Sequence, residues 1–323
     1  MGELPREHAR RPRLVRPQAA PSPVRGLAGR FRHLSAAYPY RAGDPGANAL
    51  ATGDELAHEL EAAIEAAGPG TVAAFVAEPI VGATLAAAVP PDDYWPKIAE
   101  VCRRHGVLLI ADEVMTGFGR TGRWFGLDHW AVQPDLLVAA KGATSGYWPF
   151  GFVAASDAVH GAVAGGPGFV HGFTYSHGPV AAAVGNEVLR ILEDEDLVTG
   201  SATKGDRLKA DLVAALGSHP NVGDIRGRGL LVGLELVADR ESRAPYPRSA
   251  RLTEAVVRGA RERGVLVYSG TGNADGTNGD TILLGPPFVI TDDEMGRIVE
   301  VLAEVIPSSV AGLAAVAAVS DGG

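Results

Sequence analysis

Four short apolar runs follow one another through the first half of the chain, and helix-like spacing separates several of them. The runs cover residues 72–77, 107–111, 136–139 and 152–155. Runs as uniformly apolar as these predict strands that are buried on both faces. Strands that alternate with helices form a mostly parallel sheet, whose ligand site lies beyond the carboxyl ends of the strands. An α/β fold with such a sheet is therefore expected.

Capping residues and helical apolar spacing mark the expected helices. Thr52 with Glu55, and Thr291 with Glu294, each form a capping box in which two side chains satisfy free backbone amides at a helix start. Besides the helix that opens at Thr52, helices are predicted over residues 93–104, 179–193, 252–263 and 291–306. Strand patterns at residues 230–237 and 265–268 accompany the later helices, which predicts a smaller C-terminal α+β domain.

The composition is that of a soluble globular protein with an acidic balance. Of 323 residues, 46% are hydrophobic, 21% are charged, and the formal net charge is −9. A chain this acidic is a poor partner for nucleic acid or for an anionic membrane surface. No apolar run approaches the roughly 20 residues that span a bilayer, and none follows the N-terminal Arg residues as a secretory signal requires.

Cys102 is the only cysteine, so no internal disulfide and no cysteine-based metal site are expected. A reducing cytoplasm is the expected location. The nine histidines are scattered without metal-ligand spacing, and no metal site is predicted.

The chain divides into four segments by composition and pattern. Residues 1–29 are dense in Arg and Pro without an apolar period, which predicts a disordered extension. Residues 30–200 are interpreted as the large domain and residues 201–309 as the small C-terminal domain. Residues 310–323, rich in Ala, Val, Gly and Ser, are expected to form a frayed tail.

Polar groups come directly after two of the apolar runs. Asp112 follows Val-Leu-Leu-Ile-Ala, and Lys141 follows Leu-Leu-Val-Ala-Ala. A charge at the end of a buried strand is costly unless it is paired or functional, and two opposite charges on one sheet can converge on one crevice. Pyridoxal phosphate needs such a pair: a lysine amine activated by a desolvated pocket, and a carboxylate that keeps the pyridine nitrogen protonated. The plain alternative is an exposed loop lysine and an aspartate that caps a helix.

The local sequence around these residues resembles class III aminotransferases, which are pyridoxal-phosphate-dependent enzymes of fold type I. The motifs that carry the resemblance lie between residues 30 and 306: Glu78-Pro79-Ile80, Leu109-Ile110-Ala111-Asp112-Glu113-Val114-Met115-Thr116-Gly117-Phe118-Gly119-Arg120-Thr121-Gly122, Pro134-Asp135, Ala140-Lys141-Gly142, Gly172-Phe173-Thr174-Tyr175, Arg226-Gly227-Arg228-Gly229-Leu230, and Pro286-Pro287 before Ile290-Thr291.

The resemblance implies a cofactor, a set of site residues and a dimer. It implies that Lys141 binds pyridoxal 5'-phosphate covalently and moves the proton, that Asp112 pairs with the pyridine nitrogen, and that Val114 packs on the ring. It implies that Thr174 reaches the cofactor phosphate of the neighbouring subunit, so that a homodimer shares its active sites. The large domain at residues 30–200 would then be the C-terminal portion of the cofactor-binding domain.

The chain also departs from the family pattern. Family members are longer, and a phosphate-binding turn at a helix N-terminus and a ring-stacking aromatic segment are both missing before Arg30. Met115 stands where many relatives have a Gln. Leu283 stands three residues before Pro286, where several relatives place an Arg that binds a substrate carboxylate.

The favoured interpretation is a transaminase that transfers an amino group from a primary amine or amino acid, preferably of the ω-amino type, to a 2-oxo acid by a ping-pong mechanism. One alternative keeps the cofactor and changes the reaction to that of an aminomutase, racemase or decarboxylase. The other is a truncated, non-catalytic chain that only dimerises.

Overall fold

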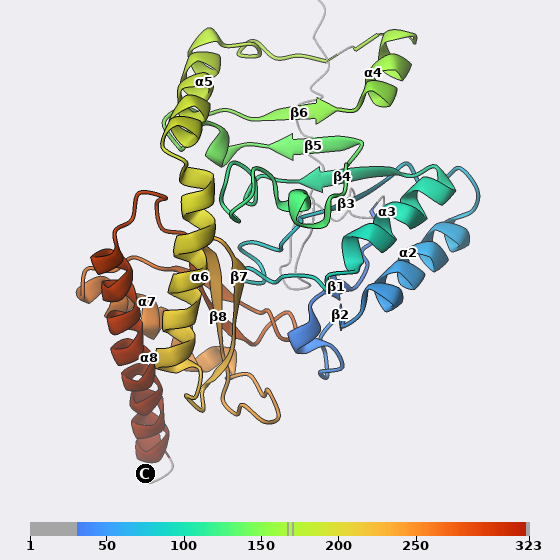
Figure 1. Cartoon of the computed structure of the whole chain (residues 1–323). Helices are drawn as coiled ribbons and strands as arrows, with labels where there is room; N and C mark the ends of the chain where they lie inside the picture. Colours follow the sequence, from blue (N-terminus) through green and yellow to red (C-terminus); the bar gives the residue numbers. More distant parts are fainter. Residues whose placement is uncertain (1–30, 167, 170, 321–323) are drawn as a thin grey trace, which may run out of the picture.

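A computed structural model describes residues 31–166, 168–169 and 171–320 of the chain. Two four-stranded sheets, each with its own helices, lie one above the other in Figure 1. Two short strands, β1 (Ala36–Ala37) and β2 (Ala49–Leu50), form a separate parallel pair near the start of the described chain. None of the helices in the described ranges is long and apolar enough to cross a membrane.

The first sheet has the strand order β3-β4-β5-β6. Its strands are β3 (Ala74–Ala77), β4 (Leu108–Asp112), β5 (Leu136–Ala139) and β6 (Phe152–Ala155). The first three are parallel to one another and β6 is antiparallel to β5, which confirms the prediction of a mostly parallel sheet. Only residues 140–151 join β5 to β6, without an α-helix among them, and such a connection suits an antiparallel return.

Helices cover one face of this sheet. Residues of α2 (Gly53–Ala67) and α3 (Tyr94–His105) bury a core against the β4 side chains Leu109 and Ala111. Farther along the same face, α5 (Pro179–Asp194) packs against Ala139 of β5. Because successive strand side chains point to opposite faces, the other face presents the remaining residues of each strand.

That second face is not part of any core among the described residues, so the prediction that these strands are buried on both faces is wrong. Its side chains are half-buried or exposed, and Val153 is 60% exposed. The strand register places the following residues on this face: Ala74, Val76, Leu108, Ile110, Leu136, Val138, Val153 and Ala155. Each run is apolar throughout, which favours burial of both faces of its strand. Among the described residues, however, helices cover only one face of the sheet.

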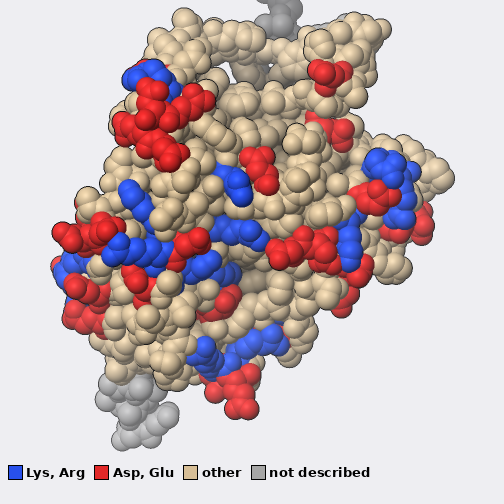
Figure 2. Space-filling view, in the orientation of Figure 1, with Lys and Arg blue, Asp and Glu red and all other residues tan. Residues whose placement is uncertain are grey.

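Three helices connect the two sheets. They are α4 (Asp157–Ala164), α5 (Pro179–Asp194) and α6 (Leu197–Leu216). The prediction of a helix over residues 179–193 is confirmed by α5. Figure 2 shows acidic side chains gathered over the carboxyl end of this helix. α4 and α6 were not predicted. α6 runs from the first part of the molecule down to the second (Figure 1), and the boundary expected at residue 200 falls within it.

The second sheet is antiparallel and has the order β7-β8-β10-β9. Its strands are β7 (Val222–Arg228), β8 (Leu231–Leu236), β9 (Tyr268–Thr271) and β10 (Asp280–Leu284), and its helices are α7 (Leu252–Glu262) and α8 (Asp292–Ser320). β8 and α7 were predicted within a few residues. The strand predicted at residues 265–268 begins only at Tyr268, whereas β7 and β10 were not predicted.

The last helix corrects the expected frayed tail. α8 continues through Pro307 to Ser320, although fraying was predicted from residue 310. Leu302, Val305 and Ile306 are buried in the second core and anchor the first part of the helix. The Ala-rich composition of the following residues supplies high helix propensity.

A buried polar network joins the N-terminal segment to the second sheet. Glu235 of β8 is fully buried and accepts hydrogen bonds from Arg41 at 2.6 Å, from Arg226 at 2.8 Å and from Asn273 at 2.6 Å. Tyr38 also donates to it. Two guanidinium groups neutralise a carboxylate that has no access to water. Arg41 also pairs with Asp44, and Arg226 also pairs with Asp224, so removal of Glu235 would leave each buried cation with one carboxylate fewer.

Candidate active site

Three titratable side chains meet at the carboxyl ends of three adjacent strands. Asp112 is the last residue of β4, Glu78 follows the last residue of β3, and Lys141 lies two residues beyond β5. In the register, Ala77 pairs with Ala111, which places Glu78 beside Asp112 on the next strand. The structure therefore brings Asp112 and Lys141 to neighbouring strand ends, at the edge where open α/β sheets bind ligands.

The backbone of Lys141 has a conformation that side chains other than glycine rarely adopt. Its φ is +39°, and it is the first residue of the 3-10 helix η4 (Lys141–Thr144). Left-handed backbone at a non-glycine residue costs free energy and concentrates at functional sites. The side chain is exposed, so the desolvated pocket expected around this lysine is not formed by the described residues.

Lys141 also differs from the other lysines in its partners. The sequence contains four lysines. Lys97 forms ion pairs with aspartates, and Lys204 and Lys209 donate to backbone carbonyls. Lys141 makes no hydrogen bond or ion pair with another described residue, so its amine is available for chemistry.

Asp112 is half-buried, and its Oδ1 accepts the backbone N–H of Val114 at 3.1 Å. This bond fixes the carboxylate at the start of the turn that leaves β4. No helix begins at this turn, so the interpretation of Asp112 as a helix cap is wrong. The half-buried Val114 lies two residues from Asp112, on the same turn.

The adjacent Glu113 has a structural role. It is fully buried and accepts the backbone N–H groups of Gly126 at 2.8 Å and Leu127 at 3.0 Å, together with the Thr116 hydroxyl. Burial raises the pKa of the Glu113 carboxyl, and these hydrogen bonds oppose the shift. Of the two consecutive acids, only Asp112 is left to face a ligand.

The loop after β4 is tied both to η4 and to the second sheet. A Cβ added to Gly142 would lie 3.1 Å from the Phe118 Cβ, so the backbone beside Lys141 packs closely on this loop. Arg120 donates to the carbonyls of Leu230 at 3.0 Å and Pro286 at 2.7 Å. Burial lowers the pKa of Arg120 to about 10. Arg120 therefore holds the site loop against the second part of the molecule.

Thr174 lies apart from this group. It is exposed, in the segment between α4 and α5, and no hydrogen bond joins it to Asp112, Val114 or Lys141. His171 and His177, which flank it, are also exposed.

Glu78 is a site residue that the sequence interpretation did not select, although it was part of a quoted motif. The signal was present, because Glu78 follows the apolar run at residues 72–77 just as Asp112 follows its own run. Burial raises the pKa of the Glu78 carboxyl, and the nearby Asp112 raises it further. Its position came from the strand register, which a single sequence does not reveal.

The donor set suits the ring and the reactive carbon of pyridoxal phosphate. An available amine and a carboxylate on the next strand are the two groups that this cofactor requires. Neither Asp112 nor Glu78 can attract a phosphate, so that part of the cofactor requires other groups.

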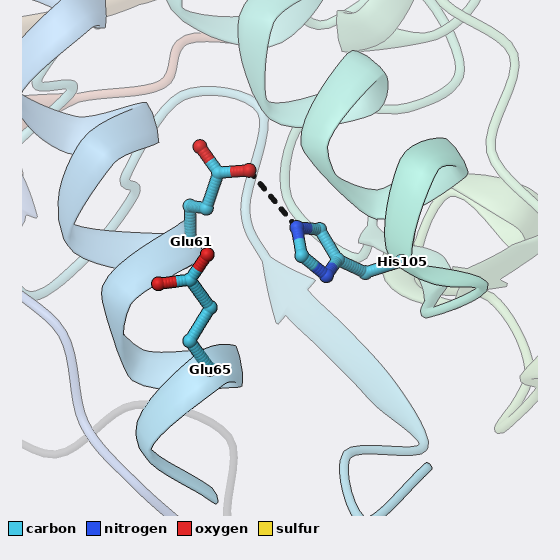
Figure 3. A group of neighbouring side chains, drawn as sticks. All are labelled: Glu61, Glu65 and His105. Atoms are coloured by element: carbon cyan, nitrogen blue, oxygen red, sulfur yellow. Dashed lines mark hydrogen bonds and ion pairs between the residues drawn. The ribbon is translucent and has the colours of Figure 1, made fainter. Parts of the chain in front are cut away.

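A second cluster of possible metal ligands lies elsewhere, on the outer side of α2 and α3. Figure 3 shows Glu61 and Glu65 of α2 beside His105 at the end of α3. Glu61 is already bonded to His105 at 2.9 Å and to Arg104 at 2.8 Å. Because the Arg104 guanidinium already pairs with the Glu61 carboxylate, the cluster is explained as a surface ion-pair network.

The fold described above is that of pyridoxal-phosphate-dependent transaminases. The chain belongs to the class-III aminotransferase family, whose model matches residues 22–306. The match begins somewhat before residue 30, where the motif resemblance was expected to start.

Relatives agree with this assignment. An aminotransferase of Bacillus subtilis, YodT, is 40% identical over 77% of this chain and 56% of its own length. The putrescine–pyruvate aminotransferase of Pseudomonas aeruginosa is 38% identical over 80% of this chain and 55% of its own length. The ω-transaminase of Pseudomonas jessenii in complex with PMP matches with a TM-score of 0.78 and 38% identity, over 88% of this chain and 61% of that one. The chain thus spans slightly more than half the length of these curated relatives.

Proposed function

We propose that this chain acts in transamination, moving an amino group from a primary amine or an ω-amino acid to a 2-oxo acid with pyridoxal phosphate on Lys141. The observation that carries the proposal is the placement of Lys141 and Asp112 at neighbouring strand ends, with Lys141 lacking a partner among the described residues. The family assignment supports it, because class III aminotransferases use this cofactor.

Each residue has a distinct task in this proposal. When bound, pyridoxal phosphate supplies a carbonyl carbon that binds amines and a protonated ring that withdraws electrons. Lys141 would hold the cofactor through its Nζ and afterwards carry the proton between substrate and cofactor carbons. The Asp112 carboxylate would keep the proton on the pyridine nitrogen, and Val114 would support the ring.

Thr174 is proposed to act across a dimer interface. Its exposure, and its separation from Lys141 within the chain, suit a residue that contacts the cofactor phosphate of a second subunit. The homodimer with shared sites is part of this proposal, as is the cytoplasmic location.

The substrate preference rests on Leu283. Its side chain is buried among Ile80, Ala86, Ala87 and Leu231, so this position presents no cation to a substrate carboxylate. Arg228, the nearby alternative, pairs with Asp92 at 2.9 Å and lies over the Trp130 ring. In this proposal Leu283 borders the substrate, and an unpaired carboxylate beside it would cost several kcal/mol. Donors without a carboxylate near the reacting nitrogen are therefore favoured, and relatives named for putrescine and for taurine fit this class.

Covalent trapping tests the cofactor assignment. The chain is incubated with pyridoxal phosphate, reduced with borohydride and mapped by peptide mass spectrometry. With only four lysines in the sequence, the expected result is a label on Lys141 that Lys141→Arg abolishes and Lys204→Arg leaves in place. A label on Lys97, Lys204 or Lys209 in the unmodified chain would contradict the assignment.

Half-reaction rates test the substrate class. A simple primary amine and an α-amino acid are compared for their ability to convert the bound cofactor to its amine form. The primary amine is expected to react faster, because Leu283 offers no charge to the carboxylate. If the α-amino acid reacts faster by tenfold or more, a cation other than one at position 283 must bind its carboxylate. Analysis of the products separates transamination from racemisation or decarboxylation on the same cofactor.

A further inference from the structure

Glu78 and Asp112 lie at the carboxyl ends of two adjacent parallel strands, Glu78 just after β3 and Asp112 as the last residue of β4. Each is the residue that follows the pair of Ala77 with Ala111, so strand alternation directs both side chains to the same face of the sheet. Neighbouring strands are about 4.8 Å apart, and like charges directly opposite each other on a sheet are unfavourable. Lys141 lies beyond the next strand, at the same edge.

The turn after β3 fixes the Glu78 carboxyl. Its Oε2 accepts the Gly82 backbone N–H at 2.9 Å, and a Cβ added to Gly82 would lie 3.1 Å from that oxygen. The turn closes through a bridge between Val81 and Ala88. Oε1 makes no hydrogen bond with another described residue.

The Arg226 guanidinium holds the far side of the same turn. It donates to the carbonyls of Leu85 at 2.7 Å and Ala86 at 3.0 Å, and Ala86 has left-handed backbone with φ of +45°. The carboxyl of Glu78 is therefore presented by a rigid segment.

The charged groups around Glu78 do not balance a negative charge on Glu78 in addition to the one on Asp112. Burial, and then the repulsion from Asp112, raise the pKa of Glu78, whereas the Gly82 N–H and the Lys141 ammonium lower it. Asp112 on β4 and Lys141 on η4 are the two charged groups that act on it. No cation forms a hydrogen bond or ion pair with Glu78 in the described part of the chain.

We propose that Glu78 is a positioning residue of the Lys141 site, which remains a neutral carboxylic acid at neutral pH so that Asp112 is the single carboxylate facing the lysine. The proposal rests on the role of Lys141 proposed above. Two carboxylates would stabilise the ammonium form of Lys141 and withhold the amine that attacks the cofactor. A neutral Glu78 keeps the amine accessible while Asp112 retains its charge for the pyridine nitrogen.

Infrared difference spectroscopy on the cofactor-free chain tests the protonation state directly. The spectrum of Glu78→Gln is subtracted from that of the unmodified chain at neutral pH, and Glu65→Gln, at an exposed position of α2, is the matched control. The expected difference for Glu78 is the loss of a protonated carboxyl band, and for Glu65 the loss of a carboxylate band. Loss of a carboxylate band in Glu78→Gln would overturn the proposal.

The reactivity of Lys141 tests the consequence. The rate of modification of Lys141 by an amine reagent is followed against pH by peptide mapping. Asp112→Asn is expected to increase the rate at neutral pH severalfold, because it removes the one charged carboxylate at this edge of the sheet. Glu78→Gln is expected to change it by less than twofold, since one neutral group replaces another. An equal acceleration in both variants would overturn the proposal.

Neither measurement uses the cofactor, so failure of the trapping experiment at Lys141 would refute the proposed function separately.

Discussion

At the scale of single residues, Lys141 and Asp112 lie at neighbouring strand ends, and each comes directly after an apolar run. That pattern alone fits a structural and a functional role equally well, and the resemblance to the family favoured the functional one. What could not be predicted is the conformation of Lys141, since its positive φ arises from the packing of η4 against the loop after β4. Glu78 also follows an apolar run, but the sequence does not reveal that its strand lies beside that of Asp112.

Cys102 provides a residue-level prediction. It is 2% exposed, and burial, together with the smaller effect of Asp135, raises the pKa of its thiol to about 12. Because the thiolate is the reactive form, a raised pKa decreases its fraction at pH 8 by about a thousandfold relative to an ordinary thiol. Modification by a chromogenic disulfide reagent is expected to be slower by at least that factor in the folded chain than in denaturant. A native rate within tenfold of the denatured rate would contradict the placement of Cys102.

At the level of elements, prediction succeeded where one residue type dominates a segment. β3, β4, β5 and β6 are apolar runs, and they form where the sequence places them. β7 reads Val-Gly-Asp-Ile-Arg-Gly-Arg, and such a polar strand is stabilised by partners far along the chain, among them the ion pair of Arg226 with Glu235. α6 contains Gly205, which local propensity disfavours, but the Gly229 backbone packs so closely there that no Cβ fits.

The cap of α2 provides an element-level prediction. Thr52 Oγ1 accepts the Glu55 N–H at 3.2 Å, and Glu55 accepts the Thr52 N–H at 3.0 Å, as the sequence predicted. Thr52→Ala removes this cap and is expected to decrease the free energy of unfolding by about 1 kcal/mol. The control is Thr203→Ala, an exposed position within α6, where alanine favours the helix. Urea titrations of both variants measure the difference, and an equal effect would argue against the cap.

For the whole molecule, the first sheet has one covered and one uncovered face within the described residues. An apolar sheet face with unpaired edges favours self-association. The family relatives are nearly twice as long as the matched region, so their architecture includes chain that has no counterpart here.

The uncovered face predicts the solution behaviour of the chain. It is expected to bind an apolar fluorescent dye and to self-associate with increasing concentration. Val153→Lys places a charge on this face and is expected to reduce both effects. Val180→Lys, at an exposed position of α5, is the control and is expected to change neither. Light scattering and dye titration measure the outcome, and a chain that stays monomeric without binding dye would contradict the prediction.

The continuity of α6 has a consequence for how the two parts of the molecule can move. A helix of 20 residues extends over about 30 Å, and bending it would break its internal hydrogen bonds. Ser201 of α6 also donates to the Arg120 carbonyl at 3.3 Å, so the helix is attached to the site loop at one end, and it packs on β7 farther along. A hinge between the two sheets at this connection is therefore disfavoured. Movement at the edge where Lys141 and Asp112 lie is then expected in the individual loops rather than between the two sheets.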